Sequence, residues 1–172
     1  MRCYNAVIKP KMQQMGDAMS IMVSGSYTSA VAANRVRIPA KYRSFLGESF
    51  YATVGTDGCF ILVPFENKDE LLKNYTSVDD PFMARKLKMV RTVNELTEVV
   101  ELDTQGRMTI TDKIKKICTG LRQPTEAIVF SGMGKYIEAW PKQVHDKVFG
   151  DVSSDDFDVL IANLKAQLGI ED

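Results

Sequence analysis

The residues whose types and spacing most clearly suggest a chemical role lie in one short stretch, Asp103-Thr104-Gln105-Gly106-Arg107. The Asp103 carboxylate can accept hydrogen bonds from backbone amides a few residues further on, as aspartate does in many turns. Gly106 can adopt a positive φ without steric cost, and Arg107 follows Asp103 at a distance that lets their charges pair. Apolar and polar residues alternate after this stretch, so it predicts two strands joined by a tight turn with a local ion pair.

A second stretch, residues 32–39, repeats this layout earlier in the chain. Here Arg35 takes the place of the later arginine. Asn34 takes the place of the glycine, and asparagine is one of the few other residues that tolerates a positive φ. Val31 takes the place of the aspartate, so no acid is expected beside Arg35. We therefore expect the later arginine to be held in its own turn, whereas Arg35 is free to contact a partner.

Both copies continue in parallel. Each is followed by a short basic segment, 41–46 or 113–118, then by two strand-like apolar runs with a glycine turn between them, and then by Pro64 or Pro141. An internal repeat of this length indicates two similar halves, each too small to be stable alone. We therefore expect the halves to share one core.

Four motifs carry a resemblance to a known family: Gly25-Ser26-Tyr27, Arg-x-x-Ile-Pro-Ala-Lys-Tyr-Arg at 35–43, Gly-x-Asp-Gly-Cys at 55–59, and Asp-x-x-Gly-Arg at 103–107. In this order and spacing they resemble the MraZ family of bacterial transcriptional regulators, over roughly residues 23–148. The first half departs from the family pattern Asp-x-x-x-Arg at its aspartate position. The resemblance implies an α+β fold with two pseudo-symmetric AbrB-like swapped-hairpin β halves, which form one barrel-like unit with intervening and C-terminal helices.

The resemblance also implies a function. It implies sequence-specific binding of double-stranded DNA and repression of the promoter of a division and cell-wall gene cluster that includes the regulator's own gene. It further implies assembly into a ring-shaped homo-oligomer. Arginine suits such a role because its fork bonds guanine edges or phosphates through two donors. The alternative is an AbrB-like interaction module, such as the antidote of a toxin–antidote pair, which would form a dimer bound to its partner.

Charge is distributed unevenly along a chain whose net charge is zero. Residues 1–47 carry seven basic side chains and one acidic side chain, whereas residues 151–172 carry six acids and one lysine. Such asymmetry predicts a basic face and an acidic end. The side chains that we expect to bind DNA are Arg35, Arg37, Lys41, Arg43 and Arg107. Those that we expect to structure the turns are Asp103, Gly106 and Asn34. If the first copy has lost its contact with DNA, the alternative surface is Arg107 with Lys113, Lys115 and Lys116.

The predicted organisation has five parts. Residues 1–21 are an N-terminal extension or a wrongly chosen start, 22–76 are the first half, 77–98 a connecting helix, 99–149 the second half, and 150–172 an acidic linker with an amphipathic helix. Apolar spacing and turn residues predict helices over Ala40–Phe45, Glu66–Tyr75, Phe82–Val93, Lys142–Phe149 and Phe157–Leu168. The last helix is expected to pack on its own protein or on a neighbouring subunit, because its polar face has few cations for a membrane.

Other kinds of chemistry find little support. The chain has three separated cysteines without a C-x-x-C pair and a single histidine, His145. This set argues against a zinc site and a disulfide framework and favours a reducing cytosol. No apolar run reaches the length of a membrane span. An aspartate paired with an arginine stays ionised and is a poor general base near neutral pH. We expect no enzymatic activity, no metal or other cofactor, no small-molecule substrate, no membrane partner, and a cytoplasmic, nucleoid-associated location.

Overall fold

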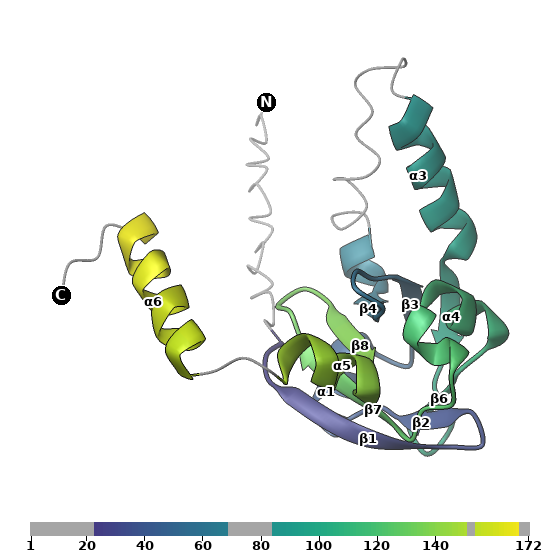
Figure 1. Cartoon of the computed structure of the whole chain (residues 1–172). Helices are drawn as coiled ribbons and strands as arrows, with labels where there is room; N and C mark the ends of the chain where they lie inside the picture. Colours follow the sequence, from purple (N-terminus) through teal and green to yellow (C-terminus); the bar gives the residue numbers. More distant parts are fainter. Residues whose placement is uncertain (1–22, 69–83, 151–153, 169–172) are drawn as a thin grey trace, which may run out of the picture.

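The computed structural model describes residues 23–68, 84–150 and 154–168 (Figure 1). Eight strands form one antiparallel sheet: β1 Ser26–Ala32, β2 Arg35–Arg37, β3 Ser49–Val54, β4 Phe60–Pro64, β5 Glu98–Glu101, β6 Arg107–Thr109, β7 Ala127–Gly132 and β8 Ile137–Pro141. Their order in the sheet is β5-β3-β4-β8-β7-β1-β2-β6. The two end strands, β5 and β6, follow each other through a tight turn, so the sheet is nearly closed into a barrel.

The two halves of the chain are interleaved within this barrel. Strand β1 pairs with β7, β2 with β6, β3 with β5, and β4 with β8, so every strand of the first half has a partner in the second. The hairpins β1–β2, β3–β4 and β7–β8 join strands of one half. The predicted α+β class, with two pseudo-symmetric β halves in one barrel-like unit, is confirmed.

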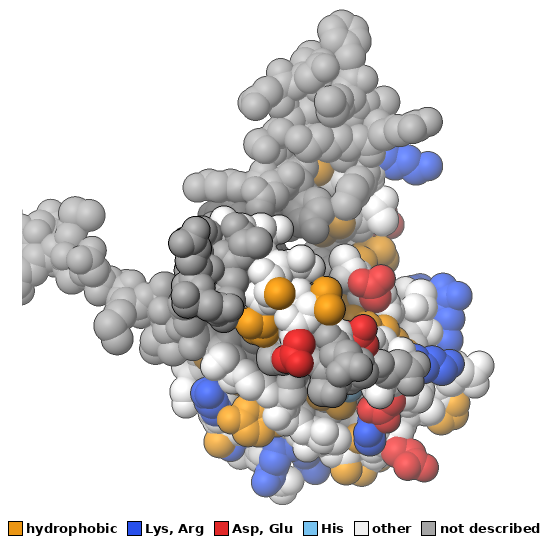
Figure 2. Space-filling model, turned by 60° about the vertical axis from the view of Figure 1, so that its left-hand side comes forward, with side chains coloured by type: hydrophobic (Ala, Val, Ile, Leu, Met, Phe, Trp, Pro, Cys, Tyr) orange, Lys and Arg blue, Asp and Glu red, His pale blue; other side chains and the backbone are white. Residues whose placement is uncertain are grey.

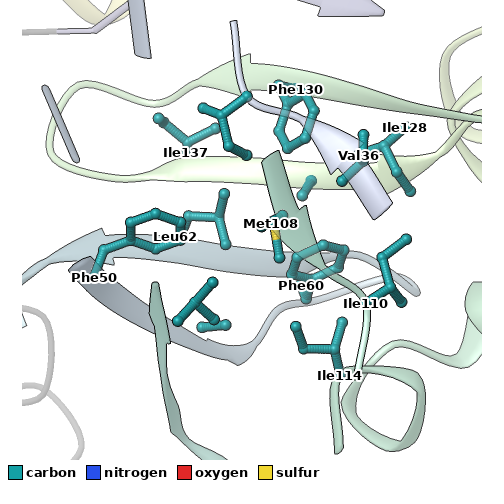
Figure 3. Close-up of a cluster of buried hydrophobic side chains, with 14 of the residues drawn as sticks. Val36, Phe50, Phe60, Leu62, Met108, Ile110, Ile114, Ile128, Phe130 and Ile137 are labelled. Atoms are coloured by element: carbon teal, nitrogen blue, oxygen red, sulfur yellow. The ribbon is translucent and has the colours of Figure 1, made fainter. Parts of the chain in front are cut away.

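The main core is a single cluster of buried side chains drawn from both halves. Figure 3 shows Phe130 and Ile137 of the second half facing Phe50 and Leu62 of the first, and Met108 belongs to the same cluster. All five side chains are fully buried. Burying one such side chain stabilises a fold by about 1.5–3 kcal/mol relative to leaving it exposed. Neither half could bury this set alone, which explains why the halves share one core.

The helices of the described residues are α1 Ala40–Leu46, α3 Ala84–Leu96, α4 Asp112–Ile117, α5 Lys142–Phe149 and α6 Ser154–Leu168, with the 3-10 helices η1 Phe65–Asn67 and η2 Thr119–Arg122. Helix α4 begins after Thr111, whose hydroxyl accepts a hydrogen bond from the Ile114 amide at 3.1 Å, as an N-cap does. Helix α5 packs on β7 and β8, whereas α3 and α6 project away from the barrel in Figure 1.

Most predicted helices are found, with shifts at their ends. Helix α5 has the predicted bounds, and α1 and α3 extend beyond their predicted C-terminal ends. Helix α6 begins at Ser154, inside the predicted linker. The N-terminal part, residues 1–21, and most of the helix predicted over 66–75 lie outside the described residues. Within the described ranges, no helix is both long enough and apolar enough to cross a membrane.

Candidate nucleic-acid interface

The first turn joins β1 to β2 through a two-residue loop. Ala32 pairs with Arg35 across this loop, and the loop residues Ala33 and Asn34 have φ values of 50° and 58°. Two successive positive φ angles are what a type I′ hairpin turn requires. The predicted positive φ of Asn34 is confirmed. The sequence gives no sign of the positive φ at Ala33, because alanine rarely adopts it.

The second turn joins β5 to β6 through a three-residue loop. The Gly106 amide donates to the Asp103 carbonyl at 2.8 Å, the Asp103 amide donates to the Arg107 carbonyl at 2.9 Å, and Gly106 has a φ of 69°. A type I turn followed by a left-handed glycine is a common loop of this length. Asp103 therefore occupies the strand position that Ala32 occupies in the first half. The predicted match of Asp103 with Val31 is wrong by one position, because it assumed loops of equal length.

Each turn is bonded to the other half of the chain. The Ile38 amide donates to the Gly106 carbonyl at 3.0 Å, and the Ile110 amide donates to the Asn34 carbonyl at 2.7 Å. Both isoleucines are buried. These reciprocal bonds hold the two turns at opposite ends of the β2–β6 pair and fix the register between its strands.

The β2–β6 register places three arginines on one face of this strand pair, which we call the β2–β6 ribbon and whose β2 strand also pairs with β1. Val36 and Met108 are paired and point into the core, since both are fully buried. Because side chains alternate along a strand, Arg35, Arg37 and Arg107 lie on the opposite, outward face. Arg37 stands directly opposite Arg107. We call these three side chains the arginine row.

Asp103 organises two members of the arginine row. One carboxylate oxygen accepts hydrogen bonds from the amides of Gln105 at 2.9 Å and Arg107 at 3.0 Å, and the other accepts a bond from Arg107 Nε at 2.8 Å. The predicted ion pair across the turn is confirmed. The amide hydrogen bond from Arg107, together with that side chain's guanidinium, holds the pKa of Asp103 below its usual value. Asp103 is therefore ionised at neutral pH.

Arg35 also has an acidic partner, contrary to the prediction from the sequence. Its Nη1 atom lies 3.8 Å from the same Asp103 oxygen that binds Arg107. The β2–β6 register, rather than the first turn, brings these residues together. The Arg35 side chain is still 51% exposed. Arg37 is exposed too, and its side chain has no hydrogen bond or ion pair within the part of the chain that the structure describes.

Lys41 lies on α1 and is tied to the backbone. Its Nζ donates to the Ser24 carbonyl at 3.1 Å, just before β1. Lys113 makes the matching contact in the second half, where its Nζ donates to the Thr97 carbonyl at 2.8 Å, just before β5. The two lysines therefore fasten corresponding helices to the beginnings of corresponding strands.

Arg43 lies against the second turn. A Cβ built at Gly106 would lie only 2.7 Å from the Arg43 Cδ, so the arginine stem covers the glycine. The Arg43 Nε is buried and has no hydrogen-bond partner among the described residues. A glycine is thus needed at position 106 for two reasons: it adopts the positive φ, and its lack of a side chain leaves the space that Arg43 fills. The predicted turn-structuring role of Gly106 agrees with this geometry.

The surface of the barrel carries charges of both signs (Figure 2). On the face shown in Figure 2, acidic and basic side chains are intermingled over the barrel. The features that distinguish the row are its register and its exposure, which the sequence does not display.

The described residues contain neither a candidate metal site nor a reactive thiol. No group of three or more His, Cys, Asp or Glu side chains within them could hold a metal ion. Cys59 and Cys118 are free, buried thiols, and burial raises the pKa of Cys59 to about 12 and that of Cys118 to about 11. Both thiols are therefore protonated at neutral pH, whereas metal binding and nucleophilic attack need the thiolate.

A scan against models of protein families finds no match. Comparison with curated proteins finds relatives named transcriptional regulator MraZ. One from Acetivibrio thermocellus is 32% identical over 153 residues, which cover 87% of this chain and 100% of the relative. The chain belongs to the MraZ family.

Two further MraZ relatives agree with this assignment. The MraZ protein of Alkaliphilus oremlandii is 31% identical over 163 residues, covering 87% of this chain and 100% of the relative. That of Lachnoclostridium phytofermentans is 32% identical over 123 residues, covering 71% and 83%. The family predicted from the four motifs is confirmed, and the MraZ relatives are named as regulators rather than as enzymes.

Proposed function

We propose that this chain is a DNA-binding transcriptional regulator that reads double-stranded DNA with the arginine row. The observation that carries this proposal is the outward face of the β2–β6 ribbon, where Arg37 stands opposite Arg107 and Arg35 lies on the same side. A two-stranded ribbon fits the major groove of B-DNA, and arginine bonds guanine O6 and N7 with both arms of its fork. The name shared by the relatives supports a regulatory role.

The members of the arginine row have different tasks in this proposal. Asp103 holds Arg107 firmly and Arg35 loosely, so both are oriented before DNA arrives and lose less conformational freedom on binding. The Arg37 side chain has no such partner among the described residues, so it is the member of the row most accessible for contacting a DNA base. Lys41 and Arg43 position the helix and the turn, because each already has a contact within the fold.

The test of DNA binding is selection from a random pool of duplexes with the purified full chain. We expect a common sequence to be enriched. Fluorescence anisotropy should then show tighter binding to the enriched duplex than to a scrambled duplex of the same composition. Failure to bind either duplex contradicts DNA binding, and equal affinity for the two contradicts sequence-specific recognition.

A ring-shaped homo-oligomer is the proposed assembly. Helix α6 exposes Val159, Leu160, Ile161 and Leu164, an apolar surface available to a neighbouring subunit. The basic and acidic ends of the chain suit head-to-tail contacts, and such contacts close into rings. A ring joins several modest arginine rows on repeated DNA sites through effective concentration. Light scattering at micromolar concentration should give the mass of several chains. A monomer contradicts the ring, and a dimer favours the antidote class.

Repression is the proposed regulatory outcome, at the promoter of a division and cell-wall gene cluster that includes the gene of this chain. Such a protein acts in the cytoplasm, at the nucleoid. A reporter fused to that promoter should become more active when the gene is deleted. A reporter signal that stays constant or falls after the deletion contradicts repression.

A further inference from the structure

Each hairpin turn borders an open hollow. The hollow beside the second turn has a volume of about 610 Å³ and is lined by Arg43, Glu48 and Asp103 among other residues. The hollow beside the first turn has a volume of about 470 Å³, and we call it the Asn34 hollow. It lies between the β1–β2 loop and the segment that contains η2, and its lining includes Ala33, Asn34, Lys115, Arg122, Gln123 and Thr125.

The two hollows occupy corresponding places in the two halves and yet carry different charges. The hollow at the second turn has two carboxylates, from Glu48 and Asp103, beside a single arginine. The Asn34 hollow is lined by two cations, Lys115 and Arg122, and none of its lining residues is acidic. An anion is therefore favoured in the Asn34 hollow, whereas the lining of the counterpart, with its two carboxylates, offers an anion no such excess of positive charge.

Both cations of the Asn34 hollow are available to a ligand. Arg122 is exposed, and its side chain makes no hydrogen bond or ion pair with any residue that the structure describes. Lys115 lies 3.5 Å from Asp112, whose side chain is 93% exposed. An ion pair so open to water contributes little free energy, so Lys115 can turn from this partner to a stronger anion. The side-chain amide of Gln123 adds a polar group to the lining, whereas the Thr125 hydroxyl already donates to the Ala127 carbonyl at 2.8 Å.

The Asn34 hollow adjoins the arginine row. Asn34 directly precedes Arg35, and consecutive Cα atoms lie about 3.8 Å apart. A ribbon that enters the major groove has the sugar–phosphate backbones on either side of it, and phosphates take most of the positioning contacts in protein–DNA complexes. We propose that the Asn34 hollow receives a phosphate of the DNA backbone, held by Lys115 and Arg122, beside the groove that the arginine row reads. This inference rests on the proposed function.

The experiment compares the double variant Lys115→Ala/Arg122→Ala with Lys147→Ala, which removes an exposed lysine of α5 that does not line the hollow. Binding to the enriched and scrambled duplexes is measured by anisotropy from about 50 to about 200 mM KCl. The double variant should weaken binding to both duplexes and lower the slope of log Kd against log salt by about 0.9 or more. The affinity ratio between the duplexes should stay constant, because phosphates carry no sequence information. Lys147→Ala should match wild type.

The outcomes separate this inference from the function on which it rests. If the double variant behaves as Lys147→Ala does while Arg37→Ala weakens binding, the inference is overturned and the proposed function stands. If wild type binds neither duplex, both are overturned.

A third arm measures thermal unfolding with inorganic phosphate at constant ionic strength. Phosphate that stabilises wild type but not the double variant, together with an unchanged DNA salt slope, would assign the hollow to a free anion and overturn the DNA contact. Circular dichroism checks that each variant is folded.

Discussion

The two halves of this chain begin corresponding strands with an arginine and yet hold it by different means. In the second half, Asp103 binds the loop amides and Arg107 at once. In the first half the corresponding strand position is Ala32, and Arg35 approaches Asp103 from across the β2–β6 pair. One carboxylate therefore serves arginines from both halves. The halves are alike in topology, but only the second contains the group that organises the shared face.

The turns themselves also differ in how their shape is maintained. The second turn relies on a glycine and on the hydrogen bonds of Asp103. The first has no side-chain acceptor of this kind and places two ordinary residues, Ala33 and Asn34, at positive φ. Changes in the second turn should therefore disturb both arginines and the fold, whereas changes in the first should be mild or even stabilising. The predictions that follow test this contrast, beginning with the largest effect.

The largest effect is expected from Gly106→Val. A β-branched residue is strained at a φ of 69°, and its Cβ would meet the Arg43 side chain. Strain of this kind costs about 1–3 kcal/mol in the free energy of unfolding, which urea titration can measure. The matched control is Asn34→Gly, because glycine adopts positive φ readily. Equal destabilisation by the two substitutions would show that the turns are equivalent.

Arg107→Ala is expected to lower the melting temperature by more than Arg35→Ala. Arg107 Nε donates to Asp103 at 2.8 Å, whereas Arg35 Nη1 lies 3.8 Å from that carboxylate and is half exposed. Both variants should lose affinity for DNA, and Arg35→Ala should do so while remaining as stable as wild type. Differential scanning calorimetry of the two proteins decides the order, and the reverse order would mean that Arg35 is the structural partner.

The pH dependence of stability should directly report the contribution of ionised Asp103 to the stability of the fold. Its pKa is lowered in the folded state from the usual 3.8, so the ionised form stabilises the fold. That contribution is fully present above pH 3.8 and is lost as the pH falls through the lower, folded-state pKa. The stability advantage of wild type over Asp103→Asn should therefore shrink in acid. If the difference in stability between wild type and Asp103→Asn stays constant from pH 7 down to about pH 2, it does not come from the charge of Asp103.

The smallest effect is expected from Ala33→Asn in the first turn. Asparagine tolerates a positive φ better than alanine, so the variant should be more stable by roughly 1 kcal/mol. Thr104→Asn in the second loop is the control, because residue 104 does not have a positive φ and should show no such gain. A loss of stability in Ala33→Asn would mean that the first turn depends on more than its backbone angles.

The sequence predicts local features of this fold well and distant ones poorly. Alternation around Met108 and the residue types of the second turn are local signals, and both describe the structure correctly. The length of the first loop has no such signal, because Ala33 is not a turn-forming residue. The approach of Arg35 to Asp103 joins residues far apart in the chain and depends on a register that reciprocal backbone bonds set.

The central claim is that the arginine row reads DNA, and Arg37 is its least constrained member among the described residues. The most direct measurement is the affinity of Arg37→Ala for the enriched and scrambled duplexes, with Arg91→Ala as control, an exposed arginine on α3. Loss of one base-reading arginine should cost about 1–3 kcal/mol, roughly a 5- to 150-fold weaker Kd, on the enriched duplex. Its preference over the scrambled duplex should fall as well, while Arg91→Ala keeps the wild-type preference. Wild-type affinity and preference in folded Arg37→Ala would contradict the claim.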